Sequence, residues 1–131
     1  MIIVLDTNVL VSALIKPESY PAHVLNAILN ENLTLLYDHR ILEEYRRVLL
    51  RPRFGFTMEM IEPLLDYLES GGQFVVANYS GRQFEDDEDK KFYEVAVTGR
   101  ADFLVTGNVR HFPNESLIIT PREFTEKELG R

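Results

Sequence analysis

The chain has 131 residues, of which 45% are hydrophobic and 27% charged, and its formal net charge is −7. This length is close to the commonest size of one domain, so we expect a single domain over residues 1–131 rather than separate cofactor and substrate lobes. The absence of cysteine excludes disulfide frameworks, thiolate zinc sites, iron–sulfur clusters and thiol nucleophiles. The negative charge argues against nonspecific binding to a polyanion but leaves room for a local basic patch.

The longest apolar run, Met1 to Leu5, is far too short to span a membrane. Asp6 interrupts this run before it could form the core of a signal peptide. We therefore expect a cytoplasmic protein with no membrane association. Since the chain has no thiol, any catalytic metal ion would be bound by oxygen or imidazole.

Short apolar runs alternate with segments of helical periodicity along the chain. The unbroken aliphatic run at 2–5 is typical of a strand buried on both faces of a parallel sheet. Further strands are predicted at 33–37, 74–76, 103–105 and 117–119. Helices are predicted at 7–14, 22–29, 39–50, 57–69, 87–98 and 122–129. Pro63 would either kink the fourth helix or mark a later start, and Gly99 suits the C-terminal cap of the fifth.

This alternation predicts an α/β fold, a three-layer α/β/α sandwich around a mostly parallel central sheet. Ligands in such folds bind at the carboxyl ends of the strands. The polar residues that end the apolar runs are therefore expected along one edge of the sheet. They are Asp6-Thr7-Asn8, Asp38 and Thr106-Gly107-Asn108.

Two acidic residues stand out because of their apolar surroundings. Asp6 follows four apolar residues, where a carboxylate needs capping partners or a cation; the alternative is an N-cap for the next helix. In the helix at 39–50, adjacent residues point about 100° apart, so only one of Glu43 and Glu44 can face a given site. Glu44 lies at the inner edge of that helix. The alternative for Glu44 is a solvated side chain or a pair with Arg47.

A run of five acids, Glu85 to Asp89, precedes and begins the helix at 87–98. Acids are favoured at a helix N-terminus, but five exceed what one terminus can use, and their mutual repulsion would raise their pKa values unless they share a cation. Helical spacing places Asp86 and Asp89 on one face, with Asp89 toward the core. Farther along, Gly107 permits a sharp turn that presents Thr106 and Asn108, although the same tripeptide is also an ordinary turn sequence.

Three carboxylates and one amide from four distant segments are thus expected at one end of the sheet: Asp6, Glu44, Asp89 and Asn108. Hard oxygen ligands without cysteine suit Mg²⁺ or Mn²⁺. An acidic site that holds such ions can cleave phosphodiesters without a covalent intermediate.

Four stretches resemble the PIN domain family in order and spacing, and together the resemblance spans roughly residues 1–121. They are Ile2–Ala13, Ile41–Leu49, Asp86–Ala96 and Ala101–Asn108. The sequence is most similar to the VapC-like group, the toxins of bacterial and archaeal toxin–antitoxin systems. The resemblance implies a Mg²⁺- or Mn²⁺-dependent endoribonuclease that acts on RNA, often a homodimer and often neutralised by a small antitoxin protein.

The resemblance also implies roles for particular residues. Asp6, Glu44, Asp89 and the residue at 108 would form the acidic quartet, and the polar neighbours would be Asn8, Ser12 and Thr106. Helical spacing adds Asp86 as a neighbour of Asp89. Many family members have Asp where this chain has Asn108. The number of metal ions therefore stays open.

Several basic residues are candidates for positioning RNA phosphates, with solvated charges or ordinary ion pairs as the alternative. They are Arg46, Arg47, Arg51, Arg53, Lys90, Lys91 and Arg110, and His111 is a further candidate for contacting RNA.

Other functional classes compete with a nuclease. A receiver domain would need a phosphoacceptor Asp after a central strand and a later Lys, and neither is visible. A haloacid-dehalogenase phosphatase would need an acid where Asn8 stands. A catalytically weakened PIN-like domain that only binds RNA or protein remains as the second hypothesis.

Overall fold

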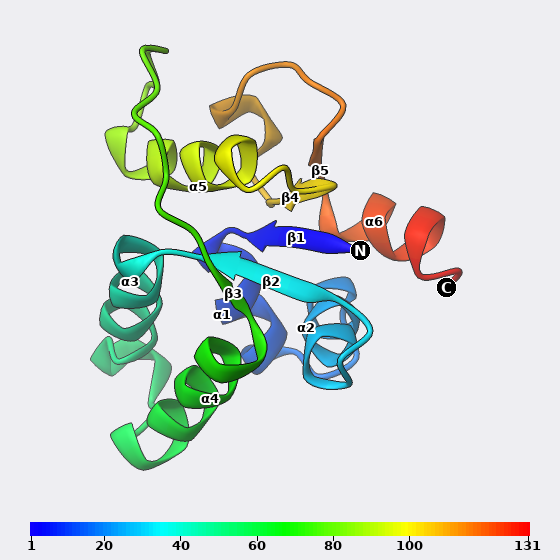
Figure 1. The fold of residues 1–131 in the computed structure, drawn as a ribbon. Coiled ribbons are helices and arrows are strands. Elements are labelled where there is room, and N and C mark those ends of the chain that lie inside the picture. The colour runs from blue at the N-terminus through cyan, green and yellow to red at the C-terminus, as the bar shows by residue number, and fades with distance from the viewer.

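Five parallel strands form one central sheet in the computed structural model, which describes residues 1–131. The strands are β1 (Ile2–Leu5), β2 (Thr34–Tyr37), β3 (Gln73–Phe74), β4 (Phe103–Val105) and β5 (Ile118–Ile119). Their order across the sheet is β3-β2-β1-β4-β5, so β1 and β4 are neighbours near its middle (Figure 1). The α/β fold is confirmed, and the sheet is wholly rather than mostly parallel.

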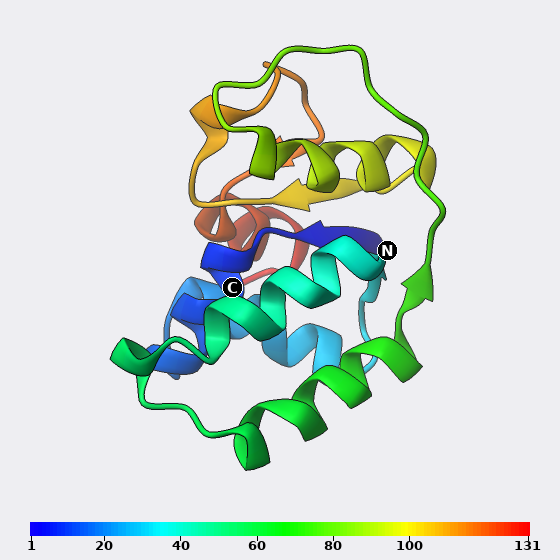
Figure 2. The ribbon, with the colours of Figure 1, turned by 90° about the vertical axis from the view of Figure 1, so that its left-hand side faces the viewer.

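Six helices flank the sheet. They are α1 (Thr7–Ile15), α2 (Tyr20–Leu29), α3 (His39–Leu49), α4 (Met58–Gly71), α5 (Asp87–Thr98) and α6 (Pro121–Glu128), with short 3₁₀ turns η1 (Pro52–Phe54) and η2 (Val109–His111). Helix α5 covers one face, and α1, α2, α3 and α4 lie on the other, as the two views agree (Figures 1 and 2). This arrangement is the expected three-layer sandwich. None of the helices is both long enough and apolar enough to cross a membrane.

Three predicted elements have different bounds. Helix α2 begins at Tyr20 rather than residue 22, because the Ser19 hydroxyl accepts a hydrogen bond from the amide of Ala22 and caps the helix. Helix α4 begins at Met58 and continues through Pro63, which rules out a later start. Strand β3 covers 73–74 instead of 74–76. Its only partner, β2, ends at Tyr37, which pairs with Phe74.

The remaining shifts are smaller, and they include β5 at 118–119 and α6 at 121–128. Two glycines allow close packing against the sheet. A Cβ at Gly72 would lie 2.7 Å from the carbonyl oxygens of Leu35 and Leu68, and one at Gly99, the C-terminal cap of α5, would lie 2.5 Å from Cδ1 of Leu36. Backbone atoms approach too closely at Gly72 for any side chain.

The carboxyl ends of β1, β2 and β4 carry the polar residues expected there, but not all of these residues are free. The Asp38 carboxylate accepts a hydrogen bond from the amide of Ile41, caps α3 and forms an ion pair with Arg40. Asp38 is thus used to start a helix. The ends of β1 and β4 are left to form the candidate site.

Candidate active site

A cleft of about 510 Å³ opens beside the ends of β1 and β4. Five acids from the end of β1, from α3 and from the start of α5 line this cleft: Asp6, Glu44, Asp86, Glu88 and Asp89. Asn8, Ser12 and Asn108 line it too. Opposite charge is supplied by Arg47, Arg51 and Arg53, from the end of α3 and from η1.

Asp6 occupies the N-cap position of α1, yet its side chain caps nothing. Instead, Oδ2 of Asp6 accepts a hydrogen bond of 2.7 Å from the hydroxyl of Thr106. Burial raises the pKa of Asp6 to about 6; the bond from Thr106 opposes the rise, and the charges of Asp89 and Glu44 add to it. Asp6 is therefore a buried carboxylate that has no basic side chain as a partner.

Residues after β4 hold Asp6 in place and shape the rim. The Thr106 hydroxyl also accepts a hydrogen bond from the amide of Asn108, and the amide of Gly107 donates to Oδ1 of Asn8 at 3.4 Å. These bonds connect the start of α1 to the loop after β4. Gly107 does not have a positive φ, so this turn does not require glycine.

Helix α3 presents Glu44 and not Glu43 to the site, as the spacing predicts. The Glu44 side chain is 11% exposed, against 67% for Glu43. Oε1 of Glu44 lies 2.6 Å from Nζ of Lys91, and Oε2 accepts a hydrogen bond from the Thr7 hydroxyl. The pair with Arg47 exists as well, but it is long, at 3.8 Å.

The start of α5 divides its acids between two roles. Asp86 caps the helix by accepting a hydrogen bond from the amide of Glu88, and Asp89 faces the cleft, where Oδ2 lies 3.2 Å from Nδ1 of His111. Burial raises the pKa of Asp89, as does the charge of Asp86, while His111 lowers it. Asn108 is exposed at the rim, and its side-chain amide has no hydrogen-bond partner within the protein.

The chemistry of this donor set fits a hard divalent cation, although no three acidic or imidazole groups converge on one point. Mg²⁺ keeps several waters and is usually bound through one or two carboxylates. Asp6 and Asp89 supply two carboxylates with raised pKa values, which is the electrostatic state that a bound cation relieves.

Sequence reasoning missed three contacts in the site. The Thr7 hydroxyl bonds to Glu44, Lys91 is buried beside Glu44, and His111 pairs with Asp89. Lys91 could have been found, because helical spacing places it on one face with Glu88 and the buried Val95. The contact of His111 joins two separate segments, so no local pattern reveals it.

The candidate phosphate-binding residues also separate in space. Arg47, Arg51 and Arg53 line the cleft, whereas Arg46 pairs with Glu62 of α4 at 2.8 Å. Lys90 lies over the ring of Tyr79. Only three of the arginines of this region are thus placed to meet a ligand in the cleft.

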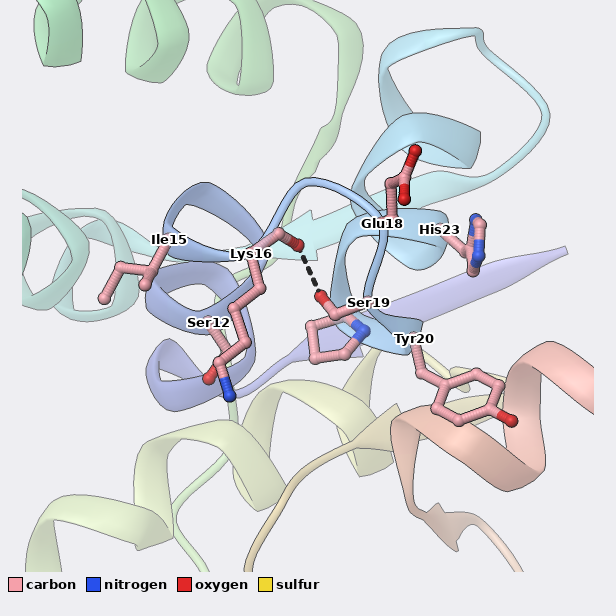
Figure 3. Close-up of a pocket in the computed structure, with 8 residues that line it drawn as sticks. Ser12, Ile15, Lys16, Glu18, Ser19, Tyr20 and His23 are labelled. Carbon is pink, nitrogen blue, oxygen red and sulfur yellow. Dashed lines mark hydrogen bonds between the residues drawn. The ribbon is translucent and has the colours of Figure 1, made fainter.

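A larger cavity, of about 660 Å³, lies between the end of α1 and the start of α2 (Figure 3). Lys16, Ser19, Tyr20 and His23 are among its lining residues, and Glu18 is the one acid among them. Ser12 lines this cavity and the acidic cleft, so the two adjoin. A third cleft, of about 370 Å³, is also lined by acids, but it lacks Asp6, Asp89 and Asn108 and does not lie at the ends of β1 and β4. The 510 Å³ cleft combines several carboxylates with those strand ends, and it is therefore the candidate active site.

Comparisons with known proteins place the chain in a family. The family model described as PIN domain matches residues 2–110. The chain is 29% identical over 109 residues to the uncharacterized protein MJ1680 of Methanocaldococcus jannaschii, and this alignment covers 81% of the chain and 70% of that protein. No solved structure matches the chain significantly. With the family match extending over most of its length, from β1 to the turn η2, the chain belongs to the PIN domain family.

Proposed function

We propose that the protein is a metal-dependent endoribonuclease that hydrolyses RNA phosphodiester bonds with Mg²⁺ or Mn²⁺. PIN domains are generally nucleases and typically use divalent metals, and this chain has the fold. The observation that carries the proposal is Asp6, a buried carboxylate with a pKa of about 6 and no cationic partner, in the same cleft as Asp89.

Asp6 and Asp89 would hold the ion, Asn108 would offer a neutral amide oxygen, and Glu44 would complete the acidic wall. A bound divalent ion supplies hydroxide near neutral pH and stabilises negative charge on the phosphate. The protein's own residues orient the carboxylates. Thr106 orients Asp6, and Thr7 with Lys91 orients Glu44, so the carboxylates are fixed before substrate binds.

The substrate would bind through its phosphates. Arg47, Arg51 and Arg53 line the same cleft as the acids and are suited to phosphate contacts. In a chain with a net charge of −7, such a local group of cations is what attraction of a polyanion requires. An RNA strand that continued beyond Ser12 would pass Lys16 in the adjoining cavity.

The biological role we propose is the toxin component of a toxin–antitoxin pair, acting in the cytoplasm as a homodimer that a small antitoxin neutralises. Support for this role is the resemblance of the sequence to the VapC-like group. Two observations favour the second hypothesis, a weakened PIN domain that only binds RNA or protein. Asn108 brings no charge, and Lys91 and His111 already contact two of the carboxylates.

Cleavage of a mixed single-stranded RNA substrate tests the enzyme hypothesis. We expect cleavage with Mn²⁺ or Mg²⁺, none in EDTA, and loss of activity in Asp6→Asn and Asp89→Asn, since each change removes a negative charge and keeps the shape. Glu43→Gln is the matched control. Cleavage that persists in EDTA or in both variants would contradict the proposal.

Metal binding is measured separately from cleavage. A cation bound only by the folded protein stabilises it by about 2.7 kcal/mol when its concentration is roughly a hundred times its dissociation constant. We expect Mn²⁺ to raise the melting temperature of the wild type and to have less effect on Asp6→Asn. A metal-induced shift without any cleavage would favour the binding-module hypothesis.

A further inference from the structure

We propose that Lys91 is a built-in cation of the active site, which takes the place of a second metal ion beside Glu44 and limits the site to one divalent ion. This inference rests on the proposed function. Lys91 acts through Glu44 and is therefore a positioning residue.

Three close contacts with oxygen atoms fix the position of the Lys91 ammonium group. Its Nζ lies 2.6 Å from Oε1 of Glu44 and 2.8 Å from Oε2 of Glu88, and it donates a further hydrogen bond of 2.6 Å to the carbonyl oxygen of Glu88. Two of the three ammonium donors form hydrogen bonds with Glu88, and the contact with Glu44 is an ion pair. The side chain is 9% exposed, so solvent does not screen the pair with Glu44 effectively.

These contacts separate Lys91 from the residues suited to bind phosphate. Arg47, Arg51 and Arg53 line the cleft, and Lys91 does not. Lys91 instead lines a neighbouring cleft of about 370 Å³, which shares Glu44, Arg47 and Glu88 with the candidate active site. Its ammonium group is paired with two carboxylates, so it is not placed to bind a phosphate in the active-site cleft. Its positive charge interacts with the carboxylates of Glu44 and Glu88 instead.

Glu44 is correspondingly occupied on both oxygens, by Lys91 and by the Thr7 hydroxyl. Thr7 follows Asp6 directly in the sequence, so the contact ties α3 and α5 to the start of α1. A metal ion that used Glu44 would have to displace the Lys91 ammonium or bind close to it, and like charges at that distance repel strongly in a buried site.

The charge balance gives the same result. Asp86 caps α5, and Glu88 pairs with Arg47 as well as Lys91, so the acids left as possible ligands are Asp6, Glu44 and Asp89. Lys91 offsets the charge of Glu44, and Asn108 adds none. Two remaining charges match one divalent ion, whereas two ions would bring four positive charges. Lys91 would thus replace the positive charge of a second ion beside Glu44, but not that ion's contact with the substrate.

The number of bound Mn²⁺ ions tests this inference. We expect one ion per chain in the wild type, counted by titration calorimetry and by loss of the free Mn²⁺ signal in electron paramagnetic resonance. Lys91→Met should bind two, because Glu44 is then free to act as a ligand. Lys91→Arg should bind one, and Lys90→Met is the matched control that should also bind one.

Lys91→Gln guards against misfolding of the methionine variant, because its amide can still donate to Glu44 or Glu88 without carrying charge, and it should bind two ions as well. Two ions in the wild type, or one ion with unchanged affinity in folded Lys91→Met and Lys91→Gln, would overturn the inference and leave the proposed function intact. A wild type that binds no Mn²⁺ would overturn both. In that case the cleavage assay would fail too.

Discussion

The hydroxyl of Thr106 bonds to Oδ2 of Asp6 between the ends of two neighbouring parallel strands. Leu5 pairs with Val105 in the register of β1 and β4, so the next residue on each strand lies beside the other. This bond fixes the Asp6 carboxylate beside the end of β4, and the carboxylate forms no capping hydrogen bond with α1. This explains why Asp6 faces the cleft although it occupies the N-cap position.

Asp6→Asn should stabilise the metal-free protein while it removes activity. Burial raises the pKa of Asp6 from 3.8 to about 6, so the folded state binds the proton more tightly than the unfolded state. The stability from this proton is full below pH 3.8 and is lost as the pH rises through about 6. At neutral pH the buried charge costs about 3 kcal/mol, which the asparagine avoids.

Urea unfolding of both proteins in metal-free buffer measures this effect. The variant should exceed the wild type by up to about 3 kcal/mol at pH 7.5 and by only about 1 kcal/mol at pH 4.5, where the unfolded carboxylate is mostly ionised and the folded one mostly neutral. An advantage that does not change between the two pH values would contradict the assignment of the raised pKa to Asp6.

Neutralising Glu44 should cost far more stability than neutralising Glu43. Glu44→Gln removes the buried one of the two carboxylates that pair with Lys91, and the loss of such a charged contact costs about 2 kcal/mol. Glu43→Gln removes only a 3.4 Å surface pair with Arg46, worth less than about 1 kcal/mol. Thermal unfolding of the two variants checks the difference, and equal losses would show that the Glu44–Lys91 contact is not formed in solution.

Asn108→Asp should strengthen metal binding and increase cleavage when metal is limiting, with little change at saturation. An amide oxygen can coordinate Mg²⁺ but brings no charge, so an aspartate at the same rim position adds attraction. Titration calorimetry and cleavage rates at several Mn²⁺ concentrations measure the effect. An Asn108→Ala variant with unchanged metal affinity and unchanged cleavage would show that residue 108 is not a ligand.

Arg51→Gln and Arg53→Gln should weaken RNA binding with little change in the Mn²⁺-induced rise in melting temperature. Both residues line the cleft, and each phosphate contact that is lost should reduce the salt dependence of binding by about one in the slope of log K against log salt. Fluorescence anisotropy with labelled RNA in metal-free buffer gives the slope. Lys127→Gln, which changes an exposed residue of α6 paired with Glu123, is the control, and an effect as large there would refute a specific role for the arginines.

Much of the fold follows from local pattern. Unbroken apolar runs such as Ile2–Leu5 identify the strands, and the alternation with amphipathic helices implies the parallel sheet. The strand-end rule also placed Asp6, Thr106 and Asn108 at one edge, and helical spacing alone selected Glu44 over Glu43. The strands, their ends and the helix faces all depend on hydrophobic periodicity and on chain direction, and both can be read from one sequence.

What the sequence by itself determined is therefore which residues end the strands and which face of each helix turns inward. Only the tertiary structure decided their charge partners. Lys91 bonds to Glu44 from another helix, and His111 reaches Asp89 from the turn after β4. Those contacts depend on how far α3, α5 and η2 lie from one another, and this spacing is set by packing across the sheet rather than by any local sequence pattern. Because of that packing, the Asp6 carboxylate has no cationic partner, whereas the Glu44 carboxylate is paired with Lys91.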